Sequence, residues 1–172
     1  MVLPIIQFVV VTAIGLYIFC WKMSLHRREA KSWDVLLARL RMDWSARELN
    51  ERFLWKEELD ATPQDVWQRM EGPKGLWVMY QNAMVMQEMA DYVVKHYEGV
   101  DLQMVENLQS GCMQVRLCVL VTLTQYGLAK AGDGVRMNAY RAASMYSAMA
   151  ARMTRLLQEH AAAQIPDFVA AM

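Results

Sequence analysis

Thioethers at helical spacing are the first side chains in this chain that could do chemistry. Met145, Met149 and Met153 follow one another at four-residue steps, which places them on one face of a helix. Thioethers are soft ligands for Cu(I), so a methionine-lined copper site is conceivable. No His or Cys joins them at ligand spacing, and such rows usually form adaptable core or a plastic docking groove. We predict core or groove, with metal handling as a third and minor alternative.

A second group of side chains could support acid–base chemistry. The group is Glu88, Asp91, Lys95 and His96. On a helix Glu88 and Asp91 at i, i+3, and Asp91 and Lys95 at i, i+4, are surface neighbours. A histidine beside carboxylates can transfer protons near neutral pH. The simpler interpretation is a solvated charged face, and we prefer it.

The sequence contains none of the common catalytic or metal-binding motifs. No histidine follows a glutamate by three residues, as a di-iron bundle requires, and Cys and His are not clustered as in zinc sites. Phosphate-binding glycine loops, HExxH and GxSxG are also absent from the sequence. We therefore predict no catalytic, cofactor-binding or metal-binding residue. Cys20, Cys112 and Cys118 form no CxxC pair and are expected to be reduced, mostly buried thiols.

The element that would position everything else is an apolar segment at the start of the chain. Residues 2–21, from Val2 to Trp21, carry no charge and are long enough to cross a bilayer as a helix. Lys22, Arg27 and Arg28 follow closely, and cations are retained on the cytoplasmic side. The sequence predicts an uncleaved anchor with its N-terminus outside and the remaining domain in the cytoplasm.

Two other interpretations compete with an anchor for this segment. A signal peptide would need a basic leader and a small-residue cleavage pattern, and neither is present. A buried core helix would need a polar face, and none interrupts the apolar run.

A tryptophan stripe follows the anchor. Trp33, Trp44 and Trp55 are spaced by eleven residues, so on a continuous helix they share one face. Residues 22–47 carry seven Lys or Arg against three acids, which favours anionic headgroups nearby. The stripe therefore faces either the membrane surface or protein, and its mixed charges favour protein. The formal charge of the whole chain is zero, so nothing indicates a nucleic-acid partner.

The rest of the pattern predicts an all-α fold: one transmembrane helix, a juxtamembrane helix and a cytoplasmic antiparallel bundle. Thr62 and Pro63 open a short helix that ends near Met70, and the Gly-Pro-Lys-Gly stretch at 72–75 marks a domain seam. Short links favour antiparallel neighbours. The long helices are predicted at 76–97, 102–130 and 135–163. The domains are predicted as 1–21 (anchor), 22–71 (juxtamembrane helices) and 72–172 (bundle).

One stretch of the second long helix is apolar all round. Residues 117–123 read LCVLVTL, which needs cover on every side and is too short to span a membrane. We therefore expect a central position or a partner contact. The predicted partner surface comprises Trp33, Trp44, Trp55, Leu117, Leu120, Met145, Met149 and Met153.

These features favour a non-catalytic, membrane-tethered interaction or assembly subunit that binds the bilayer and either a protein partner or further copies of itself. The alternative is an enzyme or ligand binder with a pocket between the long helices. Its candidate residues are Glu88, His96, Arg116 and Tyr126.

Overall fold

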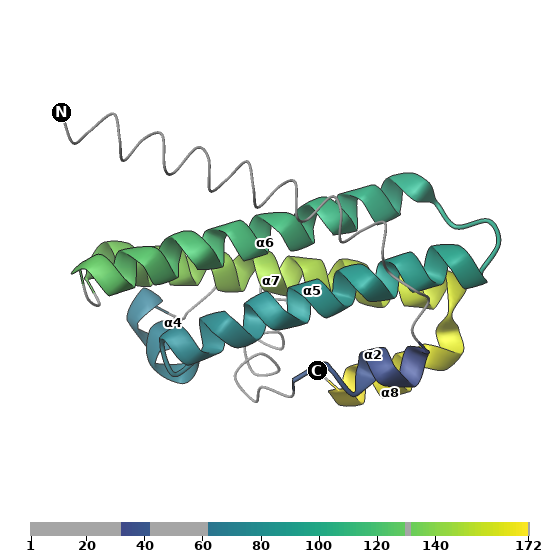
Figure 1. The fold of residues 1–172 in the computed structure, drawn as a ribbon, viewed down its shortest axis with the longest axis horizontal. Coiled ribbons are helices and arrows are strands. Elements are labelled where there is room, and N and C mark those ends of the chain that lie inside the picture. Colours follow the sequence, from purple (N-terminus) through teal and green to yellow (C-terminus); the bar gives the residue numbers. More distant parts are fainter. Residues whose placement is uncertain (1–31, 42–61, 130–131, 172) are drawn as a thin grey trace. The chain divides into compact units, whose positions relative to one another are not determined.

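A computed structural model describes residues 32–41, 62–129 and 132–171, which all belong to one compact unit, Ser32–Met172. The described residues are helical and contain no strand, so the all-α prediction is confirmed for this part of the chain (Figure 1). No helix in the described ranges is long and apolar enough to cross a membrane. The predicted anchor, Trp44, Trp55 and the basic flank at 22–31 lie outside the described residues.

Three long helices form the body of the unit. They are α5 (Pro73–His96), α6 (Leu102–Ala129) and α7 (Asp133–His160), and every end lies within three residues of its prediction. Short connections reverse the chain between them, so consecutive helices run antiparallel and all three pack against one another (Figure 1). The helical-bundle prediction is therefore confirmed.

Methionine and alanine fill much of the bundle core. Met79, Met86 and Met89 are buried on α5, and Met149 and Met153 are buried on α7. Unbranched thioether side chains fill irregular space well. Small buried residues on α7 let the neighbouring helices approach closely: Ala139, Ala142, Ala143 and Ala150. The core therefore combines flexible methionine side chains with small alanines that allow close packing against α7.

A tight turn joins the short helix α4 (Pro63–Arg69) to α5. Thr62 and Asp65 cap α4 reciprocally, each side chain accepting the other's backbone N–H at 3.2 and 3.0 Å. Gly72 has φ +61°, a conformation that favours glycine, and Pro73 then starts α5 in its first turn. The 72–75 stretch thus both ends α4 and begins α5, three residues earlier than predicted.

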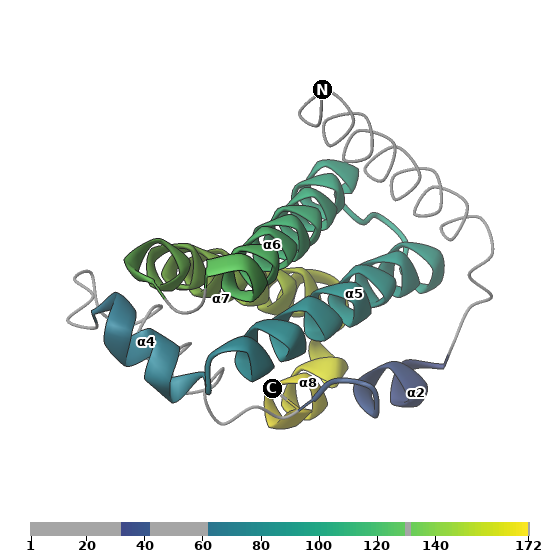
Figure 2. The ribbon, with the colours of Figure 1, turned by 60° about the vertical axis from the view of Figure 1, so that its left-hand side comes forward.

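Two short helices cover one side of the bundle. The first, α2 (Trp33–Leu37), buries Trp33 and Leu36, and the Trp33 ring lies 5.6 Å from that of Tyr92 on α5. The second, α8 (Ile165–Ala171), follows a 3₁₀ turn at Ala162–Gln164 and buries Phe168. Both lie on the side of α5 that faces away from α6 (Figures 1 and 2).

Gly75 gives the first test of this fold. A Cβ at Gly75 would lie 2.2 Å from the backbone oxygen of Met70, and the Gly75 N–H donates to that same oxygen at 2.9 Å. Backbone cannot yield as a side chain does, so Gly75→Ala is expected to destabilise the protein by about 1–3 kcal/mol. Thermal unfolding followed by circular dichroism in mild detergent measures the loss.

The matched control is Gly127→Ala. Gly127 lies in α6, and a Cβ added there would meet nothing within 4 Å, so alanine should stabilise the helix by about 0.5–1 kcal/mol. Equal unfolding midpoints for the two variants would contradict the close α4–α5 contact.

Candidate functional site

The predicted partner surface divides between core and exterior. Trp33, Met149 and Met153 are buried, and Met145 is half-buried against the core. Leu117 is exposed and Leu120 is half-buried. Of the predicted surface residues that are described, Leu117 is therefore the exposed one, and Leu120 and Met145 are intermediate.

An apolar stripe runs along the C-terminal half of α6. Leu117, Val121 and Leu128 are 39, 53 and 85% exposed, and their spacing places them on one face. The opposite face is closed, because Val119 and Thr122 are fully buried. The all-apolar stretch at 117–123 is thus covered on one side only. We call Leu117, Leu120, Val121 and Leu128 the α6 stripe.

Two aromatic residues of α5, Trp77 and Tyr80, stack with Arg116 of α6, and we call these three residues the aromatic ladder. The exposed Trp77 ring stacks on Tyr80 at 5.2 Å, and the Arg116 guanidinium lies 5.0 Å from the Tyr80 ring centre. Arg116 also donates to the Tyr80 hydroxyl at 3.3 Å and to Gln87 Oε1 at 3.4 Å. Leu120 follows Arg116 by one turn, so the ladder and the stripe are adjacent on α6.

The residues proposed for an enzymatic pocket are engaged at separate places. Glu88 accepts a two-point ion pair from Arg39, with one hydrogen bond of 3.0 Å. His96 is exposed and stacks on Tyr92 at 3.9 Å. Arg116 lies at the α5–α6 contact described above, and the Tyr126 ring packs 5.6 Å from that of Trp67. These contacts do not gather the four residues into one catalytic constellation.

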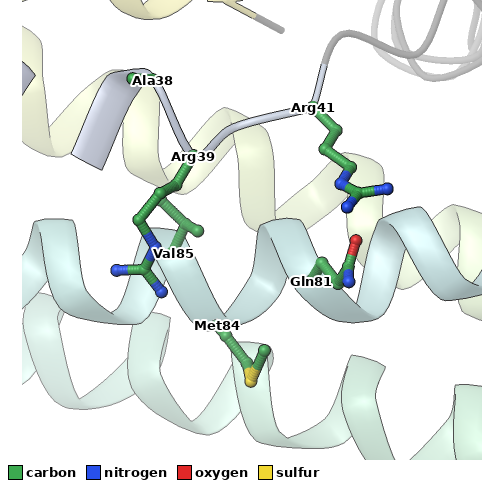
Figure 3. Close-up of a pocket in the computed structure, with 6 residues that line it drawn as sticks. All are labelled: Ala38, Arg39, Arg41, Gln81, Met84 and Val85. Atoms are coloured by element: carbon green, nitrogen blue, oxygen red, sulfur yellow. The ribbon is translucent and has the colours of Figure 1, made fainter. Parts of the chain in front are cut away.

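A polar cavity lies between the end of α2 and α5. It has a volume of about 320 Å³ and is lined by Ala38, Arg39, Arg41, Gln81, Met84 and Val85 (Figure 3). The carboxylate of Glu88 raises the pKa of Arg39 through its hydrogen bonds, so Arg39 stays charged. In the sequence, Arg39 and Arg41 are two of the seven Lys or Arg residues of segment 22–47 and belong to no binding motif. Nothing in that pattern indicates that α2 folds back onto Gln81.

The two described cysteines are suited to packing rather than to nucleophilic chemistry. Burial raises the pKa of Cys112 to about 12, and it also raises the pKa of the half-buried Cys118. The part of the chain that the structure describes holds no cluster of three or more His, Cys, Asp or Glu suited to a metal ion. No protein-family model, curated protein or solved structure matches the chain significantly.

Thiol reactivity tests the burial of Cys112. With Cys20→Ser and Cys118→Ser in place, a disulfide reagent at pH 8 should label native Cys112 at least about 100-fold more slowly than unfolded Cys112. A pKa of about 12 leaves roughly one thiolate in ten thousand at that pH, against about one in four for a free thiol. The variant that retains only Cys118 should react faster in the native state. Equal native and unfolded rates would place Cys112 at the surface.

Proposed function

We propose that this chain is a membrane-anchored, non-catalytic helical subunit that binds a protein partner, or further copies of itself, through the α6 stripe. The observation that carries the proposal is the exposure of Leu117, Val121 and Leu128 on one face of a well-packed helix. Exposed apolar side chains gathered on one helix face can form an interaction site.

The neighbouring residues support a protein partner. Trp, Tyr and Arg are the types that most often dominate binding energy at interfaces. Trp77 stacks on Tyr80, the Arg116 guanidinium lies over the Tyr80 ring, and Arg116 lies one turn before Leu120 of the α6 stripe. Their mutual stacking and hydrogen bonds hold them in place before binding, which lowers the entropy that association costs. An apolar centre with a fixed aromatic edge suits a partner helix better than a small ligand.

The membrane part of the proposal comes from the sequence. The uncharged segment 2–21 and the cations after it favour a single span with the N-terminus outside and the bundle in the cytoplasm. A tether of this kind concentrates the bundle at the membrane, where binding to another anchored protein is effectively intramolecular.

A charge placed on the α6 stripe tests the interface. Val121→Glu should leave the helix folded, because Val121 is 53% exposed, but it would bury an unpaired carboxylate in the complex. We expect the native mass of the full chain in mild detergent to fall from that of a defined complex to that of a monomer.

Val94→Glu is the matched control, since Val94 is also an exposed valine but lies near the end of α5. It should keep the mass of the complex. A wild-type chain that is monomeric, with no stoichiometric partner, would overturn the proposed function.

Topology is tested separately with reporters. A C-terminal fusion to an enzyme that is active only in the cytoplasm should be active, and one that requires export should be inactive. Lys22→Glu, Arg27→Glu and Arg28→Glu together should weaken this bias by removing the flanking cations. Export of the C-terminal reporter in the wild type would contradict the predicted orientation.

A further inference from the structure

The cavity lies between the segment that follows α2 and one stretch of α5. Its two arginines come from the segment that follows α2, and Gln81, Met84 and Val85 come from one stretch of α5 (Figure 3). Its volume of about 320 Å³ lies at the small end of the range for ligand pockets.

The main chain beneath Arg41 is held by a buried side chain. Asn82 Oδ1 accepts the Arg41 backbone N–H at 3.0 Å, and Asn82 Nδ2 donates to the Arg41 carbonyl at 3.2 Å. The same Nδ2 donates to the Tyr146 hydroxyl on α7 at 3.0 Å. Both ends of one amide therefore fix the backbone from which the exposed Arg41 side chain extends beside the cavity.

The charges around the cavity favour a monoanion. Glu88 already neutralises Arg39 through its two-point ion pair, which uses two of the five guanidinium N–H groups. Arg41 adds one further positive charge to the lining. One negative charge on a ligand is therefore balanced, and the remaining N–H groups of Arg39 can donate to neutral oxygen atoms.

Gln81 adds a requirement for a hydrogen-bond donor. Its Oε1 atom is buried, lies at this cavity and has no hydrogen-bond partner among the described residues. A buried carbonyl without a donor is unfavourable, so a hydroxyl group supplied by a ligand would be favourable. Met84 and Val85 complete the lining with an apolar edge.

We infer that the α2–α5 cavity binds a phosphodiester that carries hydroxyl groups, the chemistry of an anionic polyol lipid headgroup such as that of phosphatidylglycerol. Arg41 pairs with the phosphate, Gln81 Oε1 accepts a hydroxyl and Met84 contacts the apolar part. The same chemistry could also come from a soluble phosphodiester.

The lipid source rests on the membrane anchoring in the proposed function. Eleven residues, 22–32, separate the predicted anchor from α2, and they can reach at most about 40 Å. A headgroup in the same leaflet would then bind at a high effective concentration. The site itself requires only the residues that line the cavity.

The test uses the full chain in non-ionic detergent and follows its thermal unfolding. Short-chain phosphatidylglycerol, phosphatidylcholine of equal chain length and glycerophosphoglycerol are added in turn at increasing concentration. Phosphatidylglycerol should raise the unfolding midpoint by about 2–5 °C more than phosphatidylcholine does. Arg41→Gln should weaken the apparent affinity about tenfold, and Arg41→Lys should restore part of it.

Arg141→Gln is the control, because it removes one exposed arginine from α7 and should leave the shift unchanged. A shift with glycerophosphoglycerol as well supports recognition of the headgroup alone, and a shift with the lipid only supports a membrane source. Equal shifts with the two lipids, or a full shift in Arg41→Gln, overturn the site. The native-mass experiment is independent, so loss of the partner and loss of the lipid site are distinguishable.

Discussion

The buried amide of Asn82 is the interaction on which the arrangement of the smaller elements depends. It satisfies both backbone groups of Arg41 and the hydroxyl of Tyr146, so it ties the end of α2 to α5 and α7 at once. A buried polar side chain is stable only when its hydrogen bonds are made. Asn82 therefore specifies one position for α2, where burial of Trp33 and Leu36 alone would tolerate sliding along α5.

The long helices depend on a different kind of constraint. Methionines and alanines supply many of the core contacts of α5 and α7, whereas the buried apolar residues of α6 are Val105, Leu108, Cys112, Val115 and Val119. Unbranched methionine side chains adapt to irregular space between such neighbours. The α4–α5 turn tolerates little change in its backbone, because Gly75 lies against the Met70 backbone and Gly72 has a positive φ. The close contact in this turn therefore fixes how α5 starts relative to α4.

The sequence predicts the long helices well because each has a repeating apolar face and a clear start or stop. For the methionine row it predicts either core or a docking groove, and Met149 and Met153 lie in the core. It does not predict the cavity, since Arg39 and Gln81 are more than forty residues apart and are brought together by tertiary contacts, among them the Arg41–Asn82 hydrogen bonds and the Arg39–Glu88 ion pair. It also overstates the cover on 117–123, because an apolar run indicates that burial is favourable and not how many neighbours are available. Trp33 is predicted to face a partner or the membrane but is buried in the core, because an aromatic stripe is equally compatible with core and with an interface.

The two proposed surfaces lie on different sides of α5. The cavity belongs to the α2 side, and the α6 stripe with its aromatic ladder belongs to the helix on the other side (Figure 2). The cavity lining includes no described α6 residue, so a ligand bound there would leave Leu117 and Val121 exposed. Those side chains then face either water or a protein partner. Removing apolar surface from water is favourable by about 25 cal/mol per Å², so contact with a protein partner is favoured.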